Sequence, residues 1–195
     1  MYCSRCGTPL DEILEKYLPN KQISYCGYCE KRNFYFDEVF IGFAYKSPVS
    51  EWINELKFGK NFSIGYKLGI LIKKMFDKKI PQVDLTISIP LSTNRLRERG
   101  FNQSYLIAWG FLGKKPKNNI LKRIIDTKPQ TELSKKERWE NVKNAFLVEK
   151  DLKEKSILLI DDVMTTGATL NFASKALKEK GAKKIYALVV ARSIF

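Results

Sequence analysis

The stretch "LLIDDVMTTGATL", residues 158–170, is the most informative part of the sequence. An apolar run ends in two adjacent carboxylates, Asp161 and Asp162, and a threonine-rich loop around a single glycine follows. The apolar residues 156–160 predict a buried strand, and the residues after the loop have the spacing of a helix. Because ligands of open α/β sheets bind beyond the carboxyl ends of the strands, we expect both carboxylates at such an edge.

The loop itself predicts a phosphate-binding site. Thr165, Thr166 and Thr169 supply hydroxyl groups, and Gly167 allows a close approach of the backbone. The N-terminus of the following helix adds free N–H groups and the positive end of a dipole. The carboxylates can accept hydrogen bonds from sugar hydroxyls, directly or through Mg2+ and its waters. The pattern indicates a ribose 5-phosphate, and an ordinary strand-end turn with a helix cap is the alternative.

All four cysteines lie near the N-terminus, as two C-x2-C pairs separated by 19 residues: Cys3, Cys6, Cys26 and Cys29. This spacing predicts a structural zinc site with four thiolate ligands, since the chain contains no histidine. Disulfide-bonded pairs and a redox-active pair are the alternatives. The change from cysteines to aromatic residues near residue 33 predicts a zinc module over residues 1–33 and a second domain over residues 34–195.

The charge of the chain is positive and unevenly distributed. The 35 Lys and Arg exceed the 21 Asp and Glu by 14, and residues 90–150 alone carry +8 of this excess. Three of the eight arginines, Arg95, Arg97 and Arg99, fall within five residues. Such a segment favours polyanions, because guanidinium groups bind phosphate in a bidentate manner. A lysine-rich surface that maintains solubility and a plain solvated loop are the alternatives.

The remaining pattern predicts an α/β domain. Apolar strands without alternation in the last third, separated by a helix, predict a parallel sheet covered on both faces. No apolar run approaches the roughly 20 residues of a membrane span, and the N-terminus lacks the order of a signal peptide, so we expect a cytoplasmic location. The expected strands are 35–45, 83–90, 120–125, 156–160 and 184–192, and the expected helices are 47–59, 65–76, 102–112, 134–146 and 169–182.

The stretch "ILLIDDVMTTGATL" resembles the phosphoribosyl-pyrophosphate motif of type I phosphoribosyltransferases. Nearly the whole chain is similar to the ComF family of competence-associated proteins, which are related to the phosphoribosyltransferase half of amidophosphoribosyltransferases. The resemblance implies a type I phosphoribosyltransferase fold, a parallel sheet with flanking helices, behind an N-terminal four-cysteine zinc-ribbon-like module. The further motifs that carry it are the cysteine pairs, "LKFGKN" (56–61), "SIPLSTNRLRERGFNQS" (88–104), "TKPQTELSKKERWENVKNAF" (127–146) and "GAKKIYALVVAR" (181–192).

The resemblance also implies roles for individual residues. Asp161 and Asp162 are expected to bind the 2- and 3-hydroxyls of the ribose. The segment 95–99 resembles the mobile basic loop that closes over the diphosphate. For "RGFNQS", a helix-capping turn is the alternative to a ligand contact. The implied 5-phosphate loop is Thr165, Thr166, Gly167, Ala168 and Thr169, the pyrophosphate loop is Pro90, Leu91 and Ser92, and the residues expected on diphosphate or nucleic acid are Arg95, Arg97, Arg99, Asn102 and Gln103.

Two functions stay open at this point. The first is a phosphoribosyltransferase that uses phosphoribosyl pyrophosphate and Mg2+, with an unknown acceptor and unknown catalytic residues. The second is a non-catalytic protein that binds single-stranded DNA or a helicase, which is implied by the involvement of the ComF family in natural transformation. The partners implied are phosphoribosyl pyrophosphate or a nucleotide, single-stranded DNA, a DNA-uptake helicase and a second copy of the chain.

Overall fold

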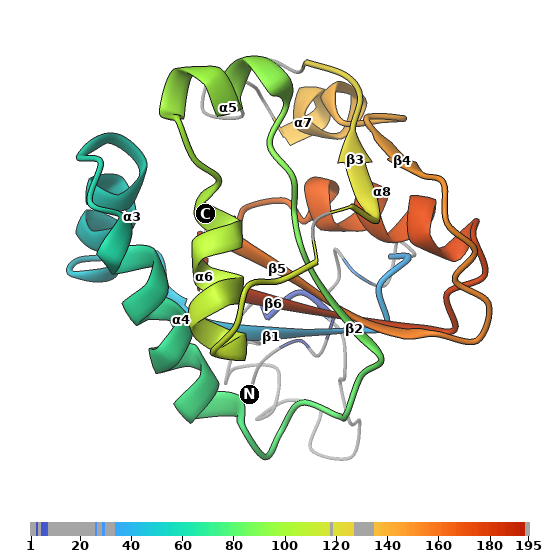
Figure 1. The fold of residues 1–195 in the computed structure, drawn as a ribbon, viewed down its shortest axis with the longest axis horizontal. Coiled ribbons are helices and arrows are strands. Elements are labelled where there is room, and N and C mark those ends of the chain that lie inside the picture. The colour runs from blue at the N-terminus through green and yellow to red at the C-terminus, as the bar shows by residue number, and fades with distance from the viewer. Residues whose placement is uncertain are drawn as a thin grey trace, which may run out of the picture.

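The computed structural model describes residues 34–117, 119–126 and 135–193, together with Cys3, residues 5–7, Cys26 and Cys29. Its centre is a four-stranded sheet with the strand order β1-β6-β5-β2 (Figure 1). Every neighbouring pair in this sheet is parallel, as the apolar strands of the sequence predicted. The strands are β1 (Glu38–Ala44), β2 (Leu85–Ser88), β5 (Ser156–Met164) and β6 (Lys184–Arg192).

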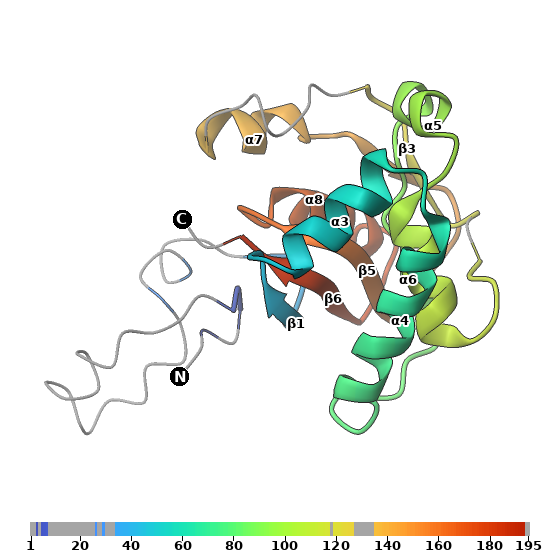
Figure 2. The same ribbon diagram turned by 90° about the vertical axis from the view of Figure 1, so that its left-hand side faces the viewer.

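Helices cover both faces of the sheet (Figure 2). Successive side chains of β5 point to opposite faces, so Ile157 and Leu159 join one hydrophobic core while Leu158 and Ile160 join another. The first core includes α8 (Ala168–Lys178), and the second includes α3 (Val49–Phe58), α4 (Phe62–Phe76) and α6 (Gln103–Leu112). Burial on both faces explains why the strand sequence is apolar without alternation.

The helices α4 and α6 pack with their backbones in close approach. A Cβ atom added at Gly69 would overlap the carbonyl oxygen of Ile107, and one added at Gly110 would overlap that of Tyr66. The two glycines therefore allow the helices to cross at backbone contact, and the pair behaves as one packed layer over the sheet.

Four short elements lie outside the main sheet. The strands β3 (Leu121–Arg123) and β4 (Phe146–Val148) form an antiparallel ribbon, which confirms the hairpin strand expected at residues 120–125. The helices α5 (Thr93–Arg99) and α7 (Lys135–Asn141) lie on the same side of the molecule in both views (Figures 1 and 2). No helix in the part of the chain that the structure describes has the length and apolar character needed to cross a membrane.

Two expectations about element boundaries are wrong. The strand expected to stop at Ile160 continues to Met164, because β6 is long enough to pair with it up to Arg192. The segment 95–99, expected as a loop, belongs to helix α5, which ends where Gly100 adopts a left-handed φ of +76°. The aspartates therefore lie inside a strand, and the arginines have fixed helical spacing.

Candidate functional site

The carboxyl ends of β2 and β5 lie side by side. The two strands are parallel neighbours, and the Ile89 N–H donates to the Ile160 carbonyl over 2.9 Å just beyond β2. Residues 90–92 follow directly, and Ser92 at the start of α5 is buried. The structure thus brings Pro90, Leu91 and Ser92 to the edge of the sheet at which the two aspartates of β5 lie.

Asp161 and Asp162 are buried, with only 8% and 5% of their surface exposed. The Ser104 hydroxyl of α6 donates to Asp161 Oδ1 over 2.8 Å. Asp162 forms an ion pair with Lys57 of α3, with 2.6 Å between Lys57 Nζ and Asp162 Oδ2. Each carboxylate therefore has its own polar partner, and each partner comes from a different helix.

These surroundings separate the acidities of the two carboxyl groups. Burial and the neighbouring charge of Asp162 raise the pKa of Asp161 to about 7, although the Ser104 hydrogen bond opposes them. Burial acts on Asp162 as well, but the charge and the hydrogen bond of Lys57 outweigh it and lower the pKa of Asp162. Near neutral pH, Asp162 is therefore ionised, whereas Asp161 is present in both its protonated and its ionised form.

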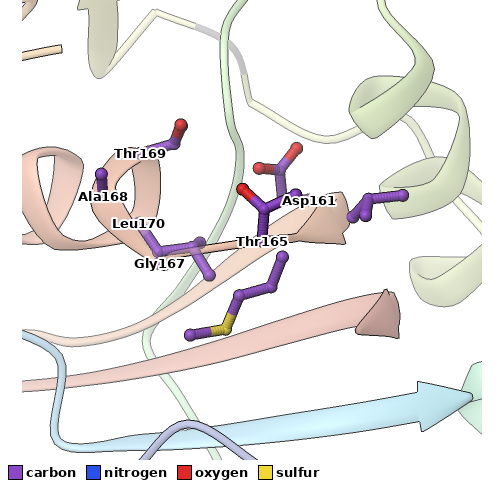
Figure 3. A pocket seen from close by; sticks show the side chains of 8 residues that line it. Asp161, Thr165, Gly167, Ala168, Thr169 and Leu170 are labelled. Atoms are coloured by element: carbon purple, nitrogen blue, oxygen red, sulfur yellow. The ribbon is translucent and has the colours of Figure 1, made fainter. Parts of the chain in front are cut away.

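A small open pocket lies beside Asp161. Asp161, Thr165 and Thr169 direct their oxygen atoms toward the same side of it (Figure 3). The pocket combines one carboxylate with two hydroxyls at the N-terminus of an 11-residue helix, where unpaired N–H groups favour anions. Its lining residues are Asp161, Val163, Met164, Thr165, Gly167, Ala168, Thr169 and Leu170.

The loop between β5 and α8 is held in one shape by its neighbours. Gly167 has a φ of +81°, and a Cβ added there would lie 2.7 Å from Met164 Cε. Arg192, the last residue of β6, donates from Nη1 to the Thr165 carbonyl. Thr166 is buried, and its hydroxyl accepts from the Ala168 N–H over 3.4 Å. Contacts with Arg192 and within the loop therefore stabilise the expected phosphate loop, and little space remains for a side chain at Gly167.

The three clustered arginines are not equivalent in the structure. Arg95 and Arg99 are half-buried on one face of α5, whereas Arg97 is exposed. Arg95 Nη2 is buried and has no hydrogen-bond partner among the described residues. The Arg99 guanidinium lies 5.6 Å from the centre of the Phe58 ring. Burial lowers the pKa of Arg99, and the attraction of Asp162 opposes this shift. Arg99 thus lies within the electrostatic range of Asp162 and of Arg95, whereas Arg97 is exposed.

A fourth cation comes from the small ribbon. Arg123 at the end of β3 lies with its guanidinium 5.6 Å from the centre of the Phe146 ring. Burial, and next the charge of Arg95, lower the pKa of Arg123 to about 10, and the charge of Asp161 opposes them. Since these charges act on one another, β3 brings Arg123 into the electrostatic range of Arg95 and Asp161.

Asn102 and Gln103 stand at the start of α6. Asn102 Oδ1 accepts from the Ser104 N–H over 2.9 Å, and its Nδ2 donates to the Ile89 carbonyl over 2.9 Å. Asn102 thus caps the helix and ties it to the end of β2, which is the alternative that the sequence left open. Gln103 is buried, and its Oε1 has no hydrogen-bond partner in the described part of the chain. A contact of either residue with diphosphate or nucleic acid stays a prediction.

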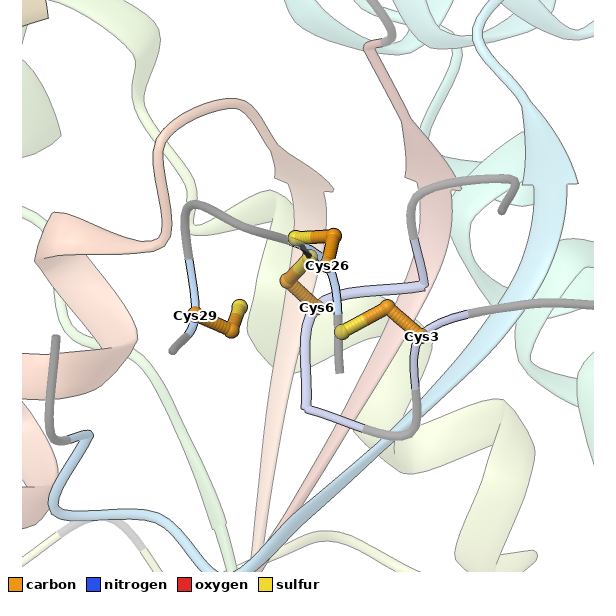
Figure 4. Close-up of side chains that lie close together, drawn as sticks. All are labelled: Cys3, Cys6, Cys26 and Cys29. Atoms are coloured by element: carbon orange, nitrogen blue, oxygen red, sulfur yellow. Dashed lines mark hydrogen bonds between the residues drawn. The ribbon is translucent and has the colours of Figure 1, made fainter. Parts of the chain in front are cut away.

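The four cysteines form a second candidate site (Figure 4). Their sulfur atoms all lie within 4.8 Å of one another, and all four are free thiols. The Cys6 and Cys26 sulfurs are 3.5 Å apart, well beyond the roughly 2 Å of a disulfide bond. The hydrogen bond with the Cys6 sulfur, together with burial, raises the pKa of Cys29. This cluster has the ligand set and the proximity to hold a metal ion.

Three residues of the candidate site were missed from the sequence: Lys57, Ser104 and Arg123. Lys57 and Ser104 lie within the quoted stretches 56–61 and 88–104, but neither has a local pattern that indicates a contact with an aspartate more than 50 residues away. For Arg123 a signal existed, since the chain uses only 8 arginines against 27 lysines. The preference for guanidinium that singled out residues 95–99 applies equally to this isolated arginine.

The chain is similar to known proteins over nearly its whole length. The family described as phosphoribosyl transferase domain matches residues 117–194, which include β5, the loop and α8. The chain is 33% identical to "Competence protein F" of Haemophilus influenzae, over 98% of this chain and 85% of the relative. It is 28% identical to "DNA utilization protein YhgH" of Escherichia coli K12, over 98% and 84% of the two chains. A purine phosphoribosyltransferase from Pyrococcus horikoshii superposes with a TM-score of 0.37 at 20% identity, over 66% of this chain and 81% of that one. The chain has a type I phosphoribosyltransferase fold, with four cysteines close together near the N-terminus, and it belongs to the ComF family of competence-associated proteins.

Proposed function

We propose that the pocket beside β5 binds phosphoribosyl pyrophosphate, or a related nucleotide, together with Mg2+. The observation that carries this proposal is the pocket shared by Asp161, Thr165 and Thr169 at the N-terminus of α8. Hydroxyls and helix N–H groups suit a phosphate, and a buried carboxylate suits the hydroxyls of a sugar. The competence-related family and the phosphoribosyl transferase domain support this assignment.

Each group of residues has a distinct role in the proposal. Thr165 to Thr169 hold the 5-phosphate, and Asp161 and Asp162 hold the ribose diol. The two carboxylates offer the oxygen ligands that Mg2+ prefers, and the ion would neutralise part of the charge of the diphosphate. Residues 90–92 and the half-buried Arg95 face the diphosphate end. The resemblance, and the position of these residues at one edge of the sheet, support these proposed roles.

The proposal concerns binding of the sugar phosphate, and enzymatic turnover makes further demands on the site. Displacement of pyrophosphate needs a nucleophilic acceptor and an arrangement that stabilises the leaving diphosphate. The arginines can supply the stabilisation, whereas the sequence contains no histidine to act as a general base. Pyrophosphate release from phosphoribosyl pyrophosphate, measured with Mg2+ against a panel of amines and nucleobases, distinguishes a transferase from a binding protein.

Equilibrium binding tests the proposal directly. Calorimetric titration with phosphoribosyl pyrophosphate should show one site per chain in Mg2+ and markedly weaker binding in a chelator of divalent ions. Ribose 5-phosphate should bind more weakly than phosphoribosyl pyrophosphate, because it lacks the diphosphate. Absence of binding by the parent protein to both ligands contradicts the proposal.

We also propose that the cysteine cluster binds one structural Zn2+. A tetrahedral site with Zn–S bonds of about 2.3 Å has sulfur–sulfur edges of about 3.8 Å, which the cluster can reach with small shifts. Cys3, Cys6 and Cys29 belong to the same hydrophobic core as Ile89 and Met164 beside the pocket. The ion would therefore fasten the segments that carry the cysteines onto the core of the larger domain.

A second candidate function is binding of single-stranded DNA on the surface formed by α4 and α6. Residues 56–76 contain five lysines and residues 99–125 contain six lysines or arginines, and neither stretch contains an acidic residue. Lys57 pairs with Asp162 and Lys122 pairs with Glu149, so the basic surface proposed for DNA consists of the lysines of α4 and of the segment that follows α6. A polyanion matches such a surface, whereas a second copy of the chain would present the same charge to it.

Aromatic rings are interleaved with these charges. Phe58 is 72% exposed, and Phe62 is also exposed and contacts the Phe101 ring at a centroid distance of 4.6 Å. Tyr66 contacts Trp109 at 5.8 Å, and Lys115 Nζ lies 5.3 Å from the centre of the Trp109 ring. Exposed rings beside cations are the arrangement on which unpaired bases stack. The relative described as a DNA utilization protein supports this candidate function.

Fluorescence anisotropy with labelled oligonucleotides tests the second function. Affinity for single-stranded DNA should fall steeply as salt rises, and Phe62→Ala with Tyr66→Ala should weaken binding without changing the salt slope. If the double variant binds single-stranded DNA as tightly as the parent does, the proposal that DNA binds on this surface is wrong. A DNA-uptake helicase and a second copy of the chain stay proposed partners, to be tested by co-purification and by sedimentation.

A further inference from the structure

We infer that Lys57 is a diphosphate-binding residue that pairs with Asp162 only until the sugar phosphate arrives. The inference rests on the proposed sugar-phosphate site and adds to it a cation that the phosphoribosyl-pyrophosphate motif does not contain. It also gives a function to the carboxyl-terminal end of α3, which lies about 100 residues before the motif in the sequence.

The position of Lys57 is unusual for a lysine. Its side chain is 19% exposed, and its ammonium group lies 2.6 Å from an oxygen of the buried Asp162. Burial of an ammonium group is costly, and one anionic partner offsets this cost. Lys57 therefore depends on an anion inside the site, and in the ligand-free protein Asp162 provides it.

A bound sugar changes this balance. In the proposed complex Asp162 accepts hydrogen bonds from the ribose diol or faces Mg2+, and both compete with the ammonium group for the same oxygen atoms. Lys57 then needs another anion within reach of its flexible four-carbon chain. The diphosphate is the part of the ligand that supplies such an anion.

The contact between α3 and α5 brings the end of α3 beside the helix that is proposed to face the diphosphate. Phe58 follows Lys57 directly, and Arg99 of α5 lies over the Phe58 ring at 5.6 Å. Lys57 of α3 contacts Asp162, and Arg99 of α5 lies within the electrostatic range of the same carboxylate. Since α5 also carries Arg95, with its buried and unpartnered Nη2, the end of α3 completes a set of cations around one region.

The competing explanation is that the ion pair between Lys57 and Asp162 has only a structural role. Binding measurements with several ligands distinguish the two explanations. If Lys57 only holds Asp162 in place, its loss should affect every ligand that contains the ribose. If Lys57 binds the diphosphate, its loss should affect phosphoribosyl pyrophosphate and leave ribose 5-phosphate unharmed. Removal of the competing ammonium group can even strengthen the binding of ribose 5-phosphate.

The experiment compares Lys57→Met with Lys183→Met by calorimetric titration in Mg2+. Lys183 is a matched control, because it forms an exposed ion pair of 2.7 Å with Glu154 just before β6, at the opposite end of the sheet. We expect Lys57→Met to weaken phosphoribosyl pyrophosphate binding about 10- to 100-fold, the range for a charged hydrogen bond. Binding of ribose 5-phosphate should stay equal or become tighter, and Lys183→Met should bind both ligands as the parent does.

Lys57→Arg keeps the experiment informative if the methionine variant is poorly folded, since it retains the charge and should keep phosphoribosyl pyrophosphate affinity within a few-fold of the parent. Equal losses for both ligands, or no loss for phosphoribosyl pyrophosphate, overturn the inference while the proposed function stands. A parent protein that binds neither ligand overturns both, so the two failures are distinguishable.

Discussion

Ser104 and Asp161 join α6 to β5 through a hydrogen bond of 2.8 Å between two buried side chains. The hydroxyl is fixed by its place in the first turn of α6, whose cap Asn102 is itself bonded to the end of β2. The segment after β2 thus positions the start of α6, and the start of α6 in turn orients one carboxylate oxygen of the proposed site. The Ser104 bond favours the ionised carboxylate, but burial and Asp162 outweigh it.

The raised pKa of Asp161 predicts how stability depends on pH. The folded value of about 7 exceeds the unfolded value of about 4, so the folded chain binds the proton more tightly. This contribution to stability is fully present below pH 4 and is lost as the pH rises through 7. The melting temperature of the parent in chelator should therefore fall between pH 5 and pH 8.

Asp161→Asn should lack this fall, because its amide does not titrate. The window is favourable for the comparison, since the chain contains no histidine that titrates in it. Differential scanning fluorimetry of both proteins over this range gives the answer. Parallel pH profiles for parent and variant contradict the assignment of the proton to Asp161.

Gly167→Ala should weaken sugar-phosphate binding by distorting the loop. The substitution places a Cβ 2.7 Å from Met164 Cε at a residue with a φ of +81°, and both effects disfavour the present shape. Gly113→Ala is a matched control, because Gly113 has a φ of +71° but no atom within 4 Å of its added Cβ. Calorimetry should show weaker binding for the Gly167 variant alone. If the Gly167 variant binds as tightly as the Gly113 variant, the prediction for the loop is wrong.

Arg95 and Arg97 should differ in their effect on diphosphate binding. Arg95→Met removes a half-buried guanidinium with an unpartnered nitrogen, whereas Arg97→Met removes an exposed one. Affinity for Mg2+–pyrophosphate should fall about tenfold or more in the Arg95 variant and by less than twofold in the Arg97 variant. Equal effects of the two substitutions would show that α5 acts through its overall charge.

One Zn2+ per chain should be present in protein purified without added metal. Elemental analysis should give a molar ratio near one for the parent, and Cys6→Ser with Cys26→Ser should remove the ion, because two ligands of four are lost. The melting temperature should fall in the double variant. Protein that contains no stoichiometric metal and retains its stability contradicts the proposed zinc site.

The sequence predicted the parts of the fold that depend on local patterns. The apolar runs of β5 and β6 indicated a covered parallel sheet, and Asn102 indicated the start of α6. Both were found because strand burial and helix capping depend on neighbouring residues. The proximity of the four cysteines likewise follows from their spacing.

Other features depend on distant contacts or on weak patterns. The end of β5 was placed too early, because aspartates are rarely buried without partners, and here Ser104 and Lys57 provide those partners. Helix α5 was expected as a loop, because none of its seven residues is buried and no apolar spacing marks it. Lys57 was missed for the same reason as the partners of most buried charges: 105 positions separate it from Asp162, and only the fold brings them together.

The most direct test of the proposed function is the calorimetric titration of the parent, of Asp161→Asn with Asp162→Asn, and of Asp84→Asn with phosphoribosyl pyrophosphate in Mg2+. Asp84 is a control carboxylate, bonded to Ser156 at the opposite end of the same strand pair. The account predicts one site per chain in the parent, an unchanged site in Asp84→Asn, and a loss of about 1.5–3 kcal/mol for each charged hydrogen bond removed in the double variant. A parent that does not bind, or a double variant that binds as tightly as the parent, would contradict it.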